Sequence, residues 1–193
     1  MSFVQTIFLD TETTGLYPSK DKLVEIAIVD SSGKVLLDTL VNPGREIGYA
    51  TSIHGITDDM VQDAPTLMEL WPEIRRIVTG HHIVIYNAEF DIGFFPDNLA
   101  CAKSISCAME RFAVIYGDWN DYFGDYTWQK LTTAAKHIEY QWQGPEHRAL
   151  SDTLATRALW VWMEDRESNY KQSDLDRSAM KNILWAIRSL YPW

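Results

Sequence analysis

Three short apolar segments in the first part of the chain constrain the fold more than any other feature of the sequence. Residues 3–9, 23–29 and 35–41 are rich in β-branched or aromatic side chains, which is the composition of strands. The last two are joined across residues 31–34, Ser-Ser-Gly-Lys, a length that suits a hairpin loop. The sequence therefore predicts three antiparallel strands at the start of the domain.

Helical patterns alternate with two further strands in the rest of the chain. Thr66 and Glu69 form a capping-box pattern that opens a helix reaching to about residue 78. Short β-branched segments at residues 82–86 and near Ile105 predict strands. Other helices are expected at residues 110–116, 127–137, 146–165 and 177–190, with loops at 118–128 and 164–176. This order favours an α/β fold with a mixed sheet.

Carboxylates occur where several of these elements end. Asp10 and Glu12 close the first strand, and they point the same way because strand side chains alternate between faces. Asp91 follows the fourth strand, and Asp152 comes five residues after His147 on the long late helix. Gathered at one sheet edge, these acids would repel one another unless cations lay between them. Their oxygens suit hard divalent ions such as Mg²⁺ and Mn²⁺, and a pair of such ions can promote phosphoryl displacement.

Three motifs in this order resemble those of the DEDDh family of 3′-to-5′ exonucleases, the proofreading-subunit or DnaQ-like group. They are LDTETTGL at residues 9–16, NAEFD at 87–91 and HRALSD at 147–152, while SIHGIT at 52–57 matches a further segment common in that family. The resemblance covers about residues 3–163 and implies an RNase H-like fold, with a mixed central sheet flanked by helices. The exonuclease domain is accordingly expected at residues 1–165. Residues 166–193 are expected to form an extension with a helix that packs on the same domain.

The resemblance implies a role for each acidic residue and for the histidine. Asp10, Glu12 and Asp152 would hold one divalent ion, and Asp10 would also reach a second. Asp91 would support the site directly or through water. His147 would be the general base that takes a proton from the attacking water, a role that suits an imidazole because its pKa lies near neutral pH.

The resemblance also implies substrate contacts from two loops. Backbone amides just after the first motif's acids would meet the terminal nucleotide, where a glycine allows a close approach. Other side chains would contact the last bases. The residues concerned are Thr13, Thr14 and Gly15 for the backbone contacts, and Leu16, His54 and Gly55 for the bases.

The implied activity is a metal-dependent 3′-to-5′ exonuclease that releases nucleoside 5′-monophosphates from single-stranded DNA ends, in proofreading or repair. The net charge of −10 argues against simple electrostatic capture of nucleic acid, although bound cations reverse the local field. Trimming of RNA 3′ ends stays open, because contacts to the ribose 2′-hydroxyl cannot be read from the sequence. A non-catalytic nucleic-acid-binding subunit with this fold is a further alternative. A polymerase or another replication or repair protein is a possible partner of the enzyme.

Composition bears on the compartment and on the remaining residues. No stretch of roughly 18 uncharged apolar residues occurs, and residues 1–9 lack the features of a secretory signal, so a soluble, cytoplasmic protein without membrane contact is expected. Cys101 and Cys107 form no metal-ligand pattern and are interpreted as packing residues. The acidic and aromatic residues 118–128 are a candidate substrate-side loop.

Overall fold

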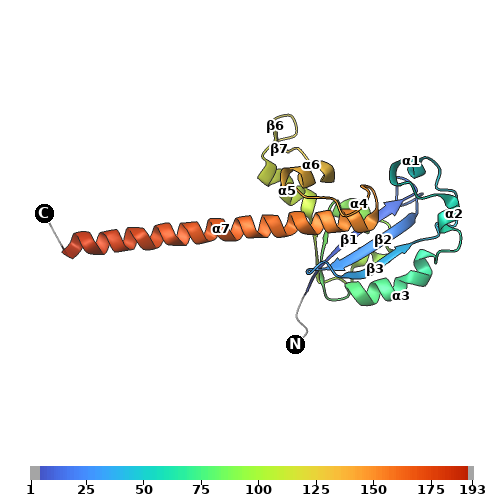
Figure 1. Ribbon diagram of the computed structural model, residues 1–193, viewed down its shortest axis with the longest axis horizontal. Coiled ribbons are helices and arrows are strands. Elements are labelled where there is room, and N and C mark those ends of the chain that lie inside the picture. The colour runs from blue at the N-terminus through green and yellow to red at the C-terminus, as the bar shows by residue number, and fades with distance from the viewer. Residues whose placement is uncertain (1–4, 191–193) are drawn as a thin grey trace. The chain divides into compact units, whose positions relative to one another are not determined.

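The computed structural model describes the backbone of residues 5–190 and the side chains of residues 5–169. Five strands form one mixed sheet in the order β3-β2-β1-β4-β5 (Figure 1). They are β1 (Thr6–Thr13), β2 (Leu23–Asp30), β3 (Val35–Leu40), β4 (His82–Ile85) and β5 (Ser104–Cys107). β2 pairs antiparallel with both β1 and β3, whereas β4 pairs parallel with β1 and β5. The predicted antiparallel trio and the mixed sheet are therefore confirmed.

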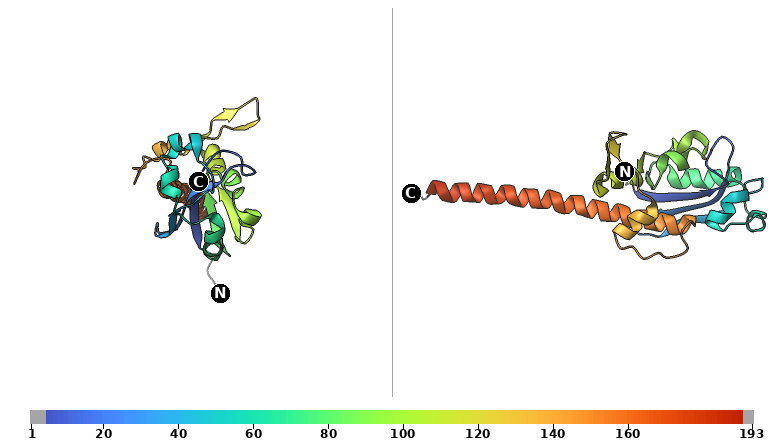
Figure 2. Two further views of the ribbon diagram at one scale, coloured as in Figure 1. Left: turned by 90° about the vertical axis from the view of Figure 1, so that its right-hand side faces the viewer. Right: turned by 90° about the horizontal axis from the view of Figure 1, so that it is seen from above.

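Helices and a small second sheet complete the described chain. The helical elements are η1 (Gly48–Ala50), α1 (Thr51–His54), α2 (Asp58–Val61), α3 (Leu67–Val78), α4 (Ala88–Ile92), η2 (Pro96–Leu99), α5 (Ala108–Tyr116), α6 (Leu131–His137) and α7 (Ala149–Leu190). β6 (Trp119–Asn120) and β7 (Asp125–Tyr126) form a two-stranded antiparallel hairpin. The view from above in Figure 2 shows the main sheet between α3 on one side and the first turns of α7 on the other.

The sheet buries side chains on both faces. On one face, Leu9 of β1 and Ile26 of β2 pack in one cluster with Ile74 of α3. The predicted capping box begins α3: Thr66 Oγ1 accepts a hydrogen bond from the backbone of Glu69, whose side chain accepts one from the Thr66 amide. Because side chains alternate along β1, its even-numbered residues point to the opposite face, where the beginning of α7 lies.

Three segments differ from the sequence-based prediction. β1 continues to Thr13, so Asp10 and Glu12 lie inside the strand and do not close it; the predicted start at residues 3 and 4 lies outside the described residues. The segment at residues 118–128 is not a plain loop, because it contains the β6–β7 hairpin. α6 begins only at Leu131.

The largest correction concerns the end of the chain. Residues 164–176, predicted as a loop, continue α7 without a break. The sequence from 149 to 190 contains neither glycine nor proline, so no residue that ends a helix interrupts the polar stretch. The predicted amphipathic face of residues 177–190 lies outside the described side chains. The chain divides into two compact units, Met1–Leu159 and Trp160–Trp193, and packing of the extension on the first unit stays a prediction.

Among the residues that the structure describes, no helix combines the length and the apolar character that crossing a membrane requires.

Candidate active site

Two carboxylates of β1 and one of α7 converge on the same face of the sheet. Asp10 and Glu12 are two residues apart on β1, and Asp152 lies in the first turn of α7. One ligand oxygen from each of the three lies within 4.8 Å of the others. Three of the four predicted carboxylates thus form a group with the spacing that a divalent cation needs.

The fourth carboxylate, Asp91 of α4, lies beside this group but is not a member of it. Asp91 is buried, and its Oδ1 accepts a hydrogen bond of 2.6 Å from Thr11 Oγ1. Its charge is one of the causes that raise the pKa of Asp10. Asp91 is therefore close enough to act on the site and is held in place by a residue of β1.

Burial and mutual repulsion raise the pKa values of all four carboxyl groups. Burial is the largest cause in each case, and neighbouring carboxylates add to it. The pKa of Glu12 rises to about 8 and those of Asp91 and Asp152 to about 7, while that of Asp10 lies well above its ordinary value. Because a divalent cation among these oxygens would offset their repulsion, the donor set fits a divalent metal ion.

A second observation supports the fit to a cation. The Oδ1 atom of Asp152 is buried and accepts no hydrogen bond from the described part of the protein. An unpaired carboxylate oxygen in the interior is costly. A metal ion would satisfy this oxygen, and water would do so less well in a cluster of four acids.

These pKa shifts predict how the stability of the metal-free protein depends on pH. The folded form binds more protons than the unfolded chain between the ordinary carboxyl pKa and the raised values, so the free energy of unfolding should fall as pH rises through that window. We therefore expect thermal melting in chelator to show declining stability between about pH 5 and about pH 8. Added Mg²⁺ should reverse the decline, and a flat profile would contradict this electrostatic description.

His147 lies next to Asp152 but ahead of the helix in which it was predicted. Its φ angle of 60° belongs to the left-handed region, which does not continue into a right-handed helix, so α7 begins at Ala149. The backbone amide of His147 hydrogen-bonds to the Asp152 carboxylate and moderates its raised pKa. The His147 side chain is exposed, on the segment that leads into the acidic cluster.

The turn after β1 is held by a residue that the sequence analysis missed. Asp21 Oδ2 accepts a hydrogen bond from the Tyr17 amide, and Asp21 Oδ1 accepts one from Thr14 Oγ1. A Cβ atom on Gly15 would lie 2.5 Å from Asp21 Oδ2. In the structure, the absence of a side chain at Gly15 therefore allows the Asp21 carboxylate to lie close to it. A close approach of a nucleotide to Gly15 stays a prediction.

The predicted base-contacting residues differ in exposure. Leu16 is 71% exposed at the tip of this turn. His54 is buried, its Nδ1 accepts a hydrogen bond from the Ile56 amide, and its Nε2 lies 3.3 Å from the carbonyl oxygen of Thr13. Burial lowers the pKa of His54, which favours the neutral ring. This ring connects the end of β1 to α1, and Gly55, the residue that follows α1, has a φ angle of 73°.

The buried Glu25 and the partly exposed Arg148 form an ion pair that the sequence analysis also missed. Glu25 lies directly opposite Glu12 in the β1–β2 ladder, and Arg148 Nε donates to Glu25 Oε1 at 3.0 Å. One signal in the sequence could have revealed the pair. Glu25 is the single charged residue in the apolar stretch LVEIAIV, where a buried acid needs a partner.

Comparisons with known proteins agree with this arrangement. The RNase T family, described as exonuclease, matches residues 7–160. An uncharacterized exonuclease of Escherichia phage 186 is 38% identical over 166 residues, which cover 79% of this chain and 84% of the phage protein. The DNA polymerase III subunit epsilon of Rickettsia conorii is 29% identical over 194 residues, or 95% of this chain and 84% of that subunit. In contrast, the chain spans only 12% of a PolC-type DNA polymerase III of Caldanaerobacter subterraneus, to which it is 30% identical.

Solved structures of similar fold are also exonucleases. Exonuclease X in complex with 5′ overhanging duplex DNA has a TM-score of 0.66 and 29% identity, covering 84% of this chain and 93% of that one. E. coli Exonuclease I in complex with a dT13 oligonucleotide has a TM-score of 0.71 over 89% of this chain and 43% of that one, and its 19% identity shows the fold alone. These likenesses confirm the RNase H-like mixed sheet. The chain therefore belongs to the RNase T family of exonucleases and, by its three motifs, to the DEDDh group of 3′-to-5′ exonucleases.

Proposed function

We propose that this enzyme removes nucleoside 5′-monophosphates from the 3′ ends of single-stranded DNA, in proofreading or repair, and that it requires two Mg²⁺ or Mn²⁺ ions per site. The observation that carries the proposal is the group formed by Asp10, Glu12 and Asp152, with His147 beside it. When bound, the two ions would neutralise the phosphate, lower the pKa of water and stabilise the leaving oxygen.

Five side chains would bind the ions and move the proton. Asp10, Glu12 and Asp152 would hold the first ion, and Asp10 would reach the second as well. Asp91, fixed by its hydrogen bond from Thr11, would support the site directly or through water. His147 would take the proton from the attacking water, because its exposed imidazole can reach solvent at the edge of the cluster.

Support for a single-stranded 3′ end comes from the turn after β1. The turn formed by Thr13, Thr14, Gly15 and Leu16 would enclose a terminal nucleotide, with the exposed Leu16 side chain against the last base. Exonuclease I was solved with a dT13 oligonucleotide, whereas Exonuclease X was solved with a 5′ overhanging duplex, in which the 3′ end is recessed and paired. The loop at Gly55 would lie on the other side of that nucleotide, since His54 connects it to Thr13.

A groove near His147 offers a path for the rest of the strand. It has a volume of about 990 Å³ and is lined in part by Lys136, Tyr140, Trp142 and Glu146. Aromatic rings of this kind can stack with bases irrespective of sequence. Because the chain is acidic overall, we expect weak binding to isolated strands, and association with a polymerase, as the epsilon relatives indicate, would compensate for it.

The assay that tests this function uses one oligonucleotide in several forms. Purified protein is incubated with 5′-labelled single-stranded DNA, duplex DNA and RNA of one sequence, with Mg²⁺, with Mn²⁺ or with chelator. We expect a ladder that shortens from the 3′ end, fastest on single-stranded DNA and absent in chelator, because the carboxylates alone would repel the phosphate.

Two further substrates are the controls for this assay. A closed circular single strand should stay intact, since the enclosed pocket requires a free end, and a 3′-phosphate should inhibit. Internal cuts in the circle would contradict an exonuclease, and faster digestion of RNA would move the assignment to RNA trimming.

A further inference from the structure

A buried carboxylate beside the metal-binding group has no part in the roles assigned so far. Glu25 of β2 is 3% exposed and lies opposite Glu12 across the strand ladder. Side chains opposite each other in a ladder point to the same face of the sheet. Glu25 therefore adds a fifth carboxylate to the neighbourhood of the site and contributes to the raised pKa values of Asp10, Glu12 and Asp152.

Two consecutive residues after His147 bind this one carboxylate. The guanidinium of Arg148 donates to both Glu25 oxygens, with Nε at 3.0 and 3.1 Å. The backbone amide of Ala149, the first residue of α7, donates to Glu25 Oε2 at 2.8 Å. A fork of this kind fixes the orientation of both groups as well as their distance.

The same attachment reaches Asp152 through the helix itself. The carbonyl oxygen of Arg148 accepts the hydrogen bond from the Asp152 amide at 3.0 Å, which is the first bond of α7. Glu25 thus fixes Arg148, the residue after the proposed base His147. It also fixes the first turn of α7, which carries the proposed metal ligand Asp152. Both proposed groups are attached to β2, the strand next to the one that carries Asp10 and Glu12.

We propose that Glu25 and Arg148 are positioning residues that set His147 and Asp152 against the carboxylates of β1, and that Arg148 keeps Glu25 from acting as a competing ligand. The proposal rests on the proposed exonuclease function. The guanidinium occupies both oxygens of Glu25, so that carboxylate has no oxygen turned freely to a cation. Without Arg148, an unpaired buried carboxylate would remain opposite Glu12, which is strongly unfavourable.

The test replaces Arg148 and compares it with a matched arginine on the same helix. Arg148→Met should lower kcat about 10- to 100-fold, the usual effect of losing a residue that orients metal ligands, with little change in KM for single-stranded DNA. Affinity for Mn²⁺, measured by calorimetry without substrate, should fall by a similar factor. A general loss of folding would instead reduce the active fraction and leave the Mn²⁺ affinity of the folded molecules unchanged.

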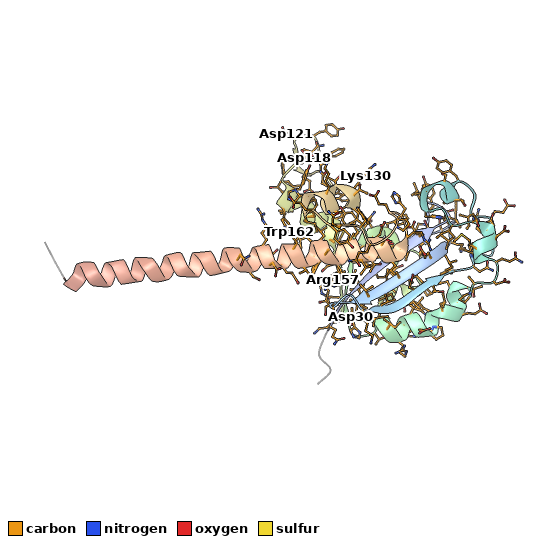
Figure 3. All side chains as sticks on the ribbon, in the orientation of Figure 1. Asp30, Asp118, Asp121, Lys130, Arg157 and Trp162 are labelled. Carbon is orange, nitrogen blue, oxygen red and sulfur yellow. The ribbon has the colours of Figure 1, made fainter. Side chains whose placement is uncertain are left out.

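Arg157→Met is the control. Arg157 also connects α7 to the β2 side of the sheet, since its Nε donates to the Ser31 carbonyl at 2.9 Å, but it lies further along the helix, near Asp30 (Figure 3). Its loss should leave kcat and Mn²⁺ affinity near those of the wild type. If Arg148→Met behaves like Arg157→Met, the positioning role is wrong, although the exonuclease function stands.

A double variant separates orientation from charge. Glu25→Gln with Arg148→Met leaves an acceptor for the Ala149 amide and no buried unpaired charge, so it should recover part of the kcat that Arg148→Met loses. A double variant with a lower kcat than Arg148→Met would contradict the pairing.

Arg148→Lys is used if Arg148→Met does not fold, because it retains the positive charge. It should still lower kcat, because the point charge of lysine cannot replace the two-point hydrogen bonding of the guanidinium. The Mn²⁺ titrations decide the inference even if the wild type digests no strand.

Discussion

Asp10→Asn is expected to abolish 3′-to-5′ hydrolysis and, in chelator at about pH 8, to make the protein more stable than the wild type. Asp10 is the carboxylate proposed to reach both ions, so its loss should exceed the roughly 10- to 100-fold effect of losing an orienting residue. Stability should change in the opposite direction, because burial and the charges of Asp91, Asp152 and Glu12 all act against an ionised Asp10. An amide of nearly the same shape removes that cost.

The sign of the stability change depends on pH. The pKa of Asp10 is raised in the folded protein, so ionisation favours the unfolded chain above the ordinary carboxyl pKa and the penalty grows with pH. The gain from Asp10→Asn should therefore be large at about pH 8 and should shrink towards about pH 4. Melting curves of both proteins in chelator across this range measure the difference.

Asp30→Asn provides a control of opposite sign. Asp30 Oδ1 accepts hydrogen bonds from Ser32 and from the Lys34 amide, and these lower the Asp30 pKa. Its ionised form is favoured by folding, so the amide should be less stable at neutral pH and should keep full activity. Equal changes in melting temperature for the two variants would show that electrostatic repulsion in the acidic cluster does not destabilise the folded protein.

The half of the site on β1 could be predicted from the sequence because it depends on a local rule. Side chains two apart on a strand share a face, and Asp10 and Glu12 meet Asp152 as expected. The antiparallel pairing of β2 with β3 followed equally from two short segments and the hairpin loop between them. Such features depend on a few neighbouring residues, which the sequence displays directly.

The other half depends on contacts between distant residues. Glu25 and Arg148 are 123 positions apart, and only the register of β1 with β2 places the acid beside the cluster. The helix start was predicted before His147, because a positive φ at a histidine leaves no mark in the sequence. The turn after β1 was interpreted through its glycine, whereas Asp21 fills the space that the glycine leaves.

The role of His147 separates catalysis from metal binding. If its imidazole takes the proton from the attacking water, His147→Ala should lower the single-turnover rate on the order of 10² to 10⁴ fold, the usual contribution of a general base. Calorimetric affinity for Mn²⁺ should stay near the wild type, since His147 contacts Asp152 through its backbone amide, which alanine retains. Asp152→Asn should weaken metal binding and turnover together.

Restoring the activity of His147→Ala with free imidazole is the most direct test of this prediction. The His147 side chain is exposed, so free imidazole in solution can enter the space that alanine leaves and restore part of the rate, more strongly as pH rises through the imidazole pKa. His81→Ala is the matched control, because His81 lies just before β4, where its Nδ1 is 3.1 Å from the carbonyl oxygen of Thr79, and no role in the reaction is assigned to it; imidazole should not change its rate. Near-normal turnover in His147→Ala would remove the histidine from the mechanism and leave the carboxylates to position a water that another base deprotonates.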